Sequence, residues 1–317
     1  MLVVLTSAKG SPGVSTATVA LAAAWSAGWR AAILECDPSG GDLAAGYGLS
    51  AEPGLLTLAS AARRDRRPGL LWEHTQELPG GLAVAPAPSS AEQATAAIDV
   101  LMSSPALRVL AQSPSDAVEN APQGFEPRRE SLTPGGHVGR AVEEGIVLVD
   151  LGRLPPHLGH DVGVSRLLAA ADVVLLVARN EQQGIVHATA RLDALRSAAG
   201  GRAERVRLLL VGAATFSPAE VALTLNVSVA GALPADARAA ALLMGRPARR
   251  AGNLARLPLV RAAAAIGNQL SIGYRREQFA EAADEGRDDG ESAWADSSGR
   301  SGRRRSAGAP PLREEAR

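Results

Sequence analysis

Short apolar runs that alternate with helical segments constrain the fold of this chain more than any other feature. The runs lack polar alternation, which is typical of strands buried on both faces of a parallel sheet. They are Leu2–Leu5, Ala31–Leu34, Leu82–Ala85, Ile146–Val149, Val173–Val177, Val206–Val211 and Val227–Leu233. Helical patterns lie between many of them, at about Ser15–Ser26, Ala91–Leu101, Val164–Ala171, Val186–Ala198 and Pro218–Leu225. This order predicts an α/β domain with a doubly wound, mostly parallel sheet of about seven or eight strands.

Two stretches depart from this alternation. Residues 103–145 are rich in Ser, Pro, Gly and charged residues and lack a hydrophobic period, which predicts a long irregular insertion. From residue 276 the chain becomes polar, and a segment of this kind buries too little apolar area to fold alone. We therefore expect one domain over residues 1–275 and a disordered tail over residues 276–317.

The composition excludes several classes of protein. The chain has 317 residues and a formal net charge of +0, which excludes a globally basic nucleic-acid-binding protein but not a local basic patch. Its single cysteine, Cys36, rules out a disulfide within the chain and suits a reducing compartment. No apolar stretch is long enough to span a membrane, and the apolar start lacks the basic leader of a signal peptide. We expect a cytoplasmic protein without integral membrane association.

A glycine-rich segment, A-K-G-S-P-G-V-S-T over Ala8–Thr16, lies between the first predicted strand and the first predicted helix. Glycines let successive backbone N–H groups point into one concavity, and the helix N-terminus adds partial positive charge. The segment is therefore suited to binding phosphate. Lys9 is the only lysine among 33 basic residues, which indicates that this position needs a compact, flexible ammonium rather than a guanidinium.

Acidic residues close two other predicted strands. Glu35 and Asp37 end the second strand, and Asp150 follows the run Ile146–Val149. The carboxyl ends of parallel strands share one edge of a sheet, where ligands bind in open α/β folds. Alone, these acids would be interpreted as solvated strand ends or helix caps. Beside the glycine-rich segment, we interpret Asp37 and Asp150 as part of a metal site.

Together these segments resemble the ParA/MinD family of ATPases. The deviant Walker A motif of that family reads K-G-G-x-G-K-[TS]. Lys9 matches its signature lysine, Gly10 and Gly13 match glycines, and Ser15 matches the hydroxyl residue that binds Mg²⁺. Val14 stands in place of the ordinary P-loop lysine.

Further motifs extend the resemblance over about residues 1–270. The segment E-C-D-P-S-G-G-D-L resembles a motif of the MinD-like branch that includes CpaE- and TadZ-type positioning proteins, and Asp37 matches its water- and Mg²⁺-positioning aspartate. Residues 146–152 resemble a Walker B segment with Asp150 near the metal. The late loop that contains Pro234 and Asp236 resembles the loop that borders the nucleotide base.

The resemblance implies a nucleotide-dependent dimeric switch that binds Mg²⁺ and ATP, and it leaves open whether ATP is hydrolysed slowly or not at all. Such a switch positions a pilus or secretion apparatus, a septum or a chromosome through a protein partner. Lys9 and Asp37 are the implied catalytic residues, with Lys9 reaching the nucleotide of the second subunit. The implied ligands of Mg²⁺ are Ser15, Asp37 and Asp150. The implied nucleotide-binding residues are Lys9, Gly10, Ser11, Pro12, Gly13, Val14, Ser15, Thr16, Pro234 and Asp236.

Other functions remain open. Val14 gives no positive charge to the phosphates, which makes a pseudo-ATPase scaffold an alternative. Gly212 offers no side-chain donor where many relatives bind adenine through asparagine, so the residues do not fix base selectivity. His157 and His160 lack further ligands for a metal. A DNA-bound partitioning ATPase is a second alternative, suggested by a basic stretch that contains Arg246, Arg249, Arg250, Arg256 and Arg261.

Overall fold

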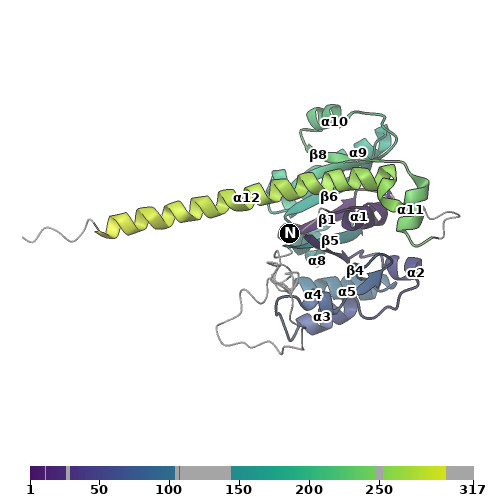
Figure 1. Ribbon diagram of the computed structural model, residues 1–317, viewed down its shortest axis with the longest axis horizontal. Coiled ribbons are helices and arrows are strands. Elements are labelled where there is room, and N and C mark those ends of the chain that lie inside the picture. Colours follow the sequence, from purple (N-terminus) through teal and green to yellow (C-terminus); the bar gives the residue numbers. More distant parts are fainter. Residues whose placement is uncertain (11, 26–28, 104–106, 108–143, 247–252, 298–317) are drawn as a thin grey trace, which may run out of the picture. The chain divides into compact units, whose positions relative to one another are not determined.

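The computed structural model describes residues 1–10, 12–25, 29–103, 107, 144–246 and 253–297. These residues contain an eight-stranded sheet in the order β3-β4-β2-β5-β1-β6-β7-β8 (Figure 1). Every neighbouring pair is parallel except β3 with β4. The predicted doubly wound, mostly parallel sheet is therefore confirmed. The strands are β1 (Leu2–Ser7), β2 (Trp29–Glu35), β3 (Gln76–Leu78), β4 (Leu82–Ala85), β5 (Glu144–Arg153), β6 (Val173–Arg179), β7 (Val206–Gly212) and β8 (Ser228–Pro234).

Helices cover both faces of this sheet. One apolar cluster takes side chains from α3 (Leu55–Ala62), α4 (Leu70–Glu73), α5 (Ala91–Met102), α8 (Val162–Ala170), α9 (Gln182–Ala198) and α10 (Pro218–Leu225). The other takes side chains from α1 (Val14–Ala23), α2 (Leu43–Tyr47), α11 (Ala237–Leu243) and the first turns of α12 (Pro258–Ser297). Successive side chains of strand β1 alternate between the two clusters: Leu2 and Val4 belong to the first, and Val3 and Leu5 belong to the second. Because both faces of β1 are buried in apolar clusters, every residue of its run is apolar.

All the predicted strands and helices have counterparts, but the chain between β2 and β4 contains elements that the sequence pattern did not predict. Helices α2, α3 and α4 and strand β3 lie there, and each is eight residues long or shorter. Short elements show too few periods for a helical or strand pattern to emerge. Helices α11 and α12 were also not predicted, and neither were three 3₁₀ turns, namely η1 (Leu158–His160), η2 (Ala203–Arg205) and η3 (Leu254–Arg256).

The predicted insertion lies largely outside the described residues, and about half of the predicted tail does so as well. Residues 104–106 and 108–143 are not described, whereas Leu107 is buried and β5 already begins at Glu144, within the predicted insertion. The chain divides into one compact unit over Met1–Ser271 and a second from Ile272 onward. Helix α12 is continuous through the predicted boundary at residue 275 and ends at Ser297, and residues 298–317 are not described. Across the described part of the chain, no helix combines the length and apolar character needed to cross a bilayer.

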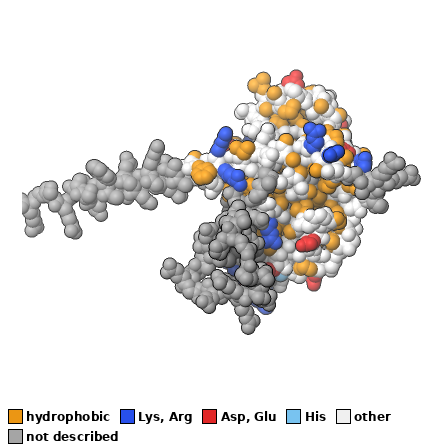
Figure 2. Space-filling model, viewed as in Figure 1, with side chains coloured by type: hydrophobic (Ala, Val, Ile, Leu, Met, Phe, Trp, Pro, Cys, Tyr) orange, Lys and Arg blue, Asp and Glu red, His pale blue; other side chains and the backbone are white. Residues whose placement is uncertain are grey.

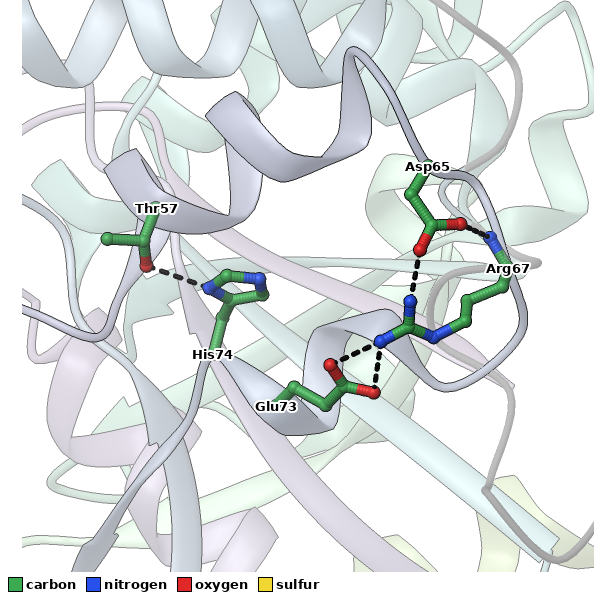
Figure 3. A network of polar contacts seen from close by, with 5 residues as sticks. All are labelled: Thr57, Asp65, Arg67, Glu73 and His74. Atoms are coloured by element: carbon green, nitrogen blue, oxygen red, sulfur yellow. Dashed lines mark hydrogen bonds and ion pairs between the residues drawn. The ribbon is translucent and has the colours of Figure 1, made fainter. Parts of the chain in front are cut away.

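A small polar network lies at the turn between α3 and α4 (Figure 3). The guanidinium of Arg67 pairs with Asp65 and with Glu73, whose Oε1 lies 2.6 Å from Arg67 Nη2. His74 Nδ1 lies 2.9 Å from Thr57 Oγ1, and partial burial lowers the pKa of this histidine. Because the Arg67 side chain is 50% exposed, these ion pairs add little to stability. We therefore assign the network a role in shaping the turn.

Candidate functional site

The glycine-rich loop joins β1 to α1 at the carboxyl edge of the sheet. Its last residue, Gly13, is the N-cap of α1 and has φ 96° and ψ 41°, a left-handed conformation that favours glycine. A glycine has no side chain to cap the helix, so the first N–H groups of α1 are left for another acceptor. Lys9 and Gly10 are exposed, and Ser11 lies outside the described residues.

The side chain of Val14 packs in the apolar core and brings no charge to this loop. Its side chain is 6% exposed and belongs to the apolar cluster that also contains Val3 and Leu5. The next two side chains, Ser15 and Thr16, are half-buried in the first turn of α1. The position of the ordinary P-loop lysine is thus occupied by a core residue.

Strand β5 brings Asp150 to the same edge. Asp150 aligns with Leu5 of β1 and with Glu35 of β2, and its carbonyl accepts a hydrogen bond from Cys36 N at 2.7 Å. The side chain is only 1% exposed. Its Oδ1 accepts a hydrogen bond from Gly152 N at 3.1 Å, whereas Oδ2 is buried and has no hydrogen-bond partner within the described residues. An unsatisfied buried carboxylate oxygen is costly, so this atom marks a place for a cation or a ligand donor.

Burial also changes the acidity of the two aspartates. Burial raises the pKa of Asp150 to about 7, and nearby Glu35 and Asp37 add to the rise, while the N–H of Gly152 and the hydroxyl of Ser15, which is near the carboxylate but makes no hydrogen bond of ordinary geometry with it, oppose the rise. Burial likewise raises the pKa of Asp37, although Ser39 N donates a hydrogen bond to its Oδ1 at 2.8 Å. Raised pKa values at two neighbouring carboxyl groups are typical of functional sites, where a cation compensates the buried charge.

Gly152 holds the two aspartates together. Its φ is +58°, and a Cβ at this position would lie 1.8 Å from Asp37 Oδ2. The carbonyl of Gly152 accepts a hydrogen bond from Thr6 Oγ1 at 3.2 Å, and Leu154 N donates to Ser7 O at 2.9 Å. The chain after Asp150 is therefore tied to the end of β1, directly before the glycine-rich loop.

We expect Gly152→Ala to damage the site severely. The new methyl group must displace the carboxylate of Asp37, so the free energy of unfolding should fall by about 2–4 kcal/mol, and the Mg²⁺-dependent nucleotide binding that the sequence predicts should be lost. Urea denaturation and calorimetry with Mg²⁺ and ATP measure the two effects. Gly48→Ala is the matched control, because Gly48 has a φ of +65° but nothing within 4 Å of its Cβ position. Equal losses in the two variants would contradict the account of Gly152.

Glu35 has a structural role that sequence reasoning did not predict. The side chain is 1% exposed, and its Oε1 accepts hydrogen bonds from Asp42 N at 2.8 Å and Leu43 N at 3.0 Å. Its Oε2 accepts a third bond from Ala87 N at 2.8 Å. Glu35 therefore fixes the loop after β2 against the chain after β4, and Asp37 lies within that loop. The pattern of a buried acid followed by D-P-S-G-G-D is the signal that could have revealed this role.

Two cavities flank the loop. The first, of about 250 Å³, contains Lys9 on its wall, and its lining is Ala8, Lys9, Gly10, Pro12, Val177, Ala178, Arg179, Glu181, Gln183, Gly184 and His187. The second, of about 300 Å³, contains the predicted base-side residues. Its lining is Pro12, Gly13, Thr16, Ala17, Arg179, Val211, Gly212, Leu233, Pro234, Ala235, Asp236, Ala237, Ala240 and Leu259. The structure thus brings most of the predicted nucleotide-binding residues to the two sides of one loop.

The two carboxylate oxygens of Asp236, which lines the second cavity, have different surroundings. Its Oδ1 accepts a hydrogen bond from Ala239 N at 2.9 Å and caps α11. Its Oδ2 is buried without a hydrogen-bond partner in the described part of the chain. Gly212 lines the same cavity with φ +99° and, having no side chain, leaves backbone groups as its polar atoms.

The donor set at the carboxyl edge fits Mg²⁺. A carboxylate and a hydroxyl are the hard oxygen ligands that this ion prefers, and the unsatisfied Oδ2 of Asp150 supplies one such oxygen. Within the described ranges, no group of three or more His, Cys, Asp or Glu side chains can hold a metal alone, and this includes His157 and His160. Mg²⁺ commonly needs only one or two protein ligands, because waters and phosphates complete its shell.

The basic stretch is only partly described. Arg246, Arg256 and Arg261 are exposed, whereas Arg249 and Arg250 lie outside the described residues. Figure 2 shows Lys and Arg side chains at several separate places on the face it presents, with neutral and hydrophobic atoms between them. DNA binding through this stretch stays a prediction.

Comparison with known proteins identifies the fold. No protein-family model and no curated protein matches the sequence. Among solved structures, a ParA family ATPase from Chlorobium tepidum is 16% identical, with a TM-score of 0.56 over 84% of this chain and 98% of that one. Cyanthece McdA, solved in its apo state, is 14% identical, with a TM-score of 0.54 over 84% of this chain and 98% of that one. The septum site-determining protein MinD from Pyrococcus horikoshii, complexed with Mg-ADP, is 13% identical, with a TM-score of 0.53 over 85% and 95%. The chain therefore has the fold of ParA- and MinD-type ATPases.

Proposed function

We propose that this chain binds a nucleoside triphosphate together with Mg²⁺ at the carboxyl edge of its sheet and acts as a nucleotide-dependent dimeric switch. The observation that carries the proposal is the buried, unsatisfied Oδ2 of Asp150 beside Asp37 and the glycine-rich loop. A carboxylate oxygen left without a partner in this position is suited to a metal that a bound phosphate completes. The same fold holds Mg-ADP in the MinD of Pyrococcus horikoshii, which supports the choice of ligand.

Each part of the site has a defined task in this proposal. Backbone N–H groups of the loop and of the first turn of α1 bind phosphate oxygens, and the second cavity accepts the base. Ser15, Asp37 and Asp150 hold Mg²⁺ directly or through water. When bound, the ion neutralises phosphate charge and links it to the two aspartates. Asp37 also orients the water that attacks the terminal phosphate.

The proposed switch positions a larger assembly through a protein partner. The family resemblance favours the CpaE- and TadZ-type branch, which acts on pili, secretion systems or septa, and a chromosome-partitioning role through DNA is the alternative. The fold carries nucleotide chemistry in ParA family ATPases and in a septum site-determining MinD, which supports the general kind of function. The partner itself follows from the resemblance alone.

A scaffold that binds nucleotide without turnover is a second candidate. The observation that favours it is the burial of Val14 in the core, which removes one positive charge from the phosphate site. Loss of one such group typically lowers a rate by about two to three orders of magnitude. Phosphate release under single-turnover conditions separates the candidates, since a scaffold should release none over hours.

Lys9→Ala is expected to abolish ATP-dependent dimerisation while leaving the fold intact. The exposed side chain of Lys9 lines the first cavity and can reach a second molecule, and its removal costs no buried contact. Analytical ultracentrifugation with Mg²⁺ and ATP should show a dimer for the parent chain and a monomer for the variant. The exposed Arg202→Ala variant, with the same change in charge, should still form the dimer. Full dimerisation of Lys9→Ala would refute the role of this lysine.

A further inference from the structure

The two cavities beside the loop share one arginine, Arg179, in their linings. Among the described residues, Pro12 and Arg179 line both cavities. Within the described residues, Lys9 and Arg179 are the only lysine and arginine that line either cavity. Val14 carries no charge and is buried, so among the described residues Arg179 is the basic residue that the second cavity shares with the first.

The backbone of Arg179 is held firmly. Arg179 is the last residue of β6 and pairs in register with Val211 of β7. The next residue, Asn180, is 4% exposed, and its N donates a hydrogen bond to Val211 O at 2.9 Å. The side chain of Asn180 donates to Phe216 O at 2.9 Å and accepts from Phe216 N at 3.2 Å.

The start of α9 packs closely on the same backbone. A Cβ at Gly184 would lie 2.3 Å from the carbonyl oxygen of Arg179, so the two segments are in contact. The exposed side chain of Arg179 therefore projects from a backbone fixed by β7, by Asn180 and by α9. The point from which the guanidinium projects is therefore fixed relative to the loop, which limits the places that its planar donor group can reach.

We propose that Arg179 binds the phosphate groups of the nucleotide and replaces the positive charge that position 14 lacks. The proposal rests on the proposed function, because it takes the nucleotide to lie along the loop. A guanidinium presents several N–H donors in a plane and binds two phosphate oxygens at once. Glu181 lines the first cavity and Asp236 the second, and Arg179, which lines both, offsets part of the negative charge that would repel a phosphate chain.

Two substitutions and one control test this role. Arg179→Ala removes the charge, Arg179→Lys keeps it without the planar donor group, and Arg202→Ala removes an exposed charge before β7, at the opposite end of the strands. Isothermal calorimetry with ATP, ADP and AMP, each with Mg²⁺, reports the affinity, and thermal unfolding shows that each variant is folded. We expect Arg179→Ala to weaken ATP binding about ten- to a hundred-fold and AMP binding less than threefold. Arg179→Lys should recover part of the loss, and Arg202→Ala should bind as the parent chain does.

Three other outcomes would each overturn the proposal, and each for a different reason. If the parent chain binds ATP and Arg179→Ala binds it equally well, Arg179 does not contact phosphate. If Arg179→Ala loses ATP and AMP by the same factor, the arginine acts on the nucleoside or on the α-phosphate, which AMP also carries, and does not supply the missing charge at the β- and γ-phosphates. If the parent chain binds none of the three nucleotides, the proposed function itself has failed and the arginine's role fails with it.

Discussion

Asp150→Asn is expected to make the ligand-free protein more stable at pH 8 and to abolish its stabilisation by Mg²⁺ and ATP. The carboxylate of Asp150 is 1% exposed, and its Oδ2 has no hydrogen-bond partner in the described residues. Asparagine keeps the oxygen that accepts from Gly152 N but removes the buried charge. We expect a gain of about 1–3 kcal/mol in the free energy of unfolding at pH 8.

The gain should depend on pH in a defined direction. Burial raises the pKa of Asp150 from 3.8 to about 7, so between these pH values the folded chain holds a proton that the unfolded chain has released. The contribution of this group to stability is therefore highest at low pH and is lost as the pH rises towards 7. Asparagine does not titrate, so the advantage of the variant should be largest at pH 8 and small at pH 4.5.

Thermal unfolding at both pH values, with and without Mg²⁺ and ATP, measures these effects together. Asp193→Asn is the control, because the side chain of Asp193 is 98% exposed and its substitution should change neither quantity. An Asp150→Asn variant that is still stabilised by Mg²⁺ and ATP would remove Asp150 from the metal site. A variant less stable than the parent chain at pH 8 would contradict the buried-charge argument.

Glu35→Ala should destabilise the chain more than any surface substitution. It leaves the N–H groups of Asp42, Leu43 and Ala87 without their acceptor in a buried site. Removing one charged partner from such a network typically costs several kcal/mol, so we expect a loss of about 3–5 kcal/mol in the free energy of unfolding. Because the same carboxylate fixes the loop that contains Asp37, nucleotide binding should weaken as well.

Glu35→Gln separates the charge from the shape of this side chain. Glutamine keeps one oxygen that can accept hydrogen bonds from two of the three backbone N–H groups. Its NH₂ group then lies opposite the third N–H, so two donors meet and that N–H has no acceptor. We expect a loss between that of alanine and the parent chain, at about 1–3 kcal/mol. Urea denaturation of the three proteins gives the order. A loss below about 1 kcal/mol for Glu35→Ala would show that water or another group replaces the carboxylate.

The sequence predicted the sheet and the edge where the site lies, for a physical reason. Strands buried on both faces are continuous apolar runs, and β1, β2, β5 and β6 show this pattern clearly. Parallel strands share their carboxyl edge, so the acids that follow β2 and β5 had to lie near the loop after β1. The seven-residue strand β8 was predicted one residue early.

Other features were beyond sequence reasoning because they depend on three-dimensional contacts. Glu35 and Asp37 look alike in the sequence, yet one accepts three backbone hydrogen bonds and the other lies against Gly152. The burial of Val14 follows from the side of α1 that faces the sheet. Arg179 was missed because it ends an apolar strand with no motif around it, and only the packed structure brings it beside the loop.

Equilibrium binding of ATP with Mg²⁺ to the full chain, measured by isothermal calorimetry, tests the proposed nucleotide site most directly. We expect saturable binding of about one nucleotide per chain with a Kd on the order of micromolar, strongly weakened when Mg²⁺ is omitted. For Asp150→Asn we expect Mg²⁺ to have no effect on the affinity for ATP. No binding at millimolar ATP by a chain that unfolds cooperatively would contradict a nucleotide site at this edge of the sheet.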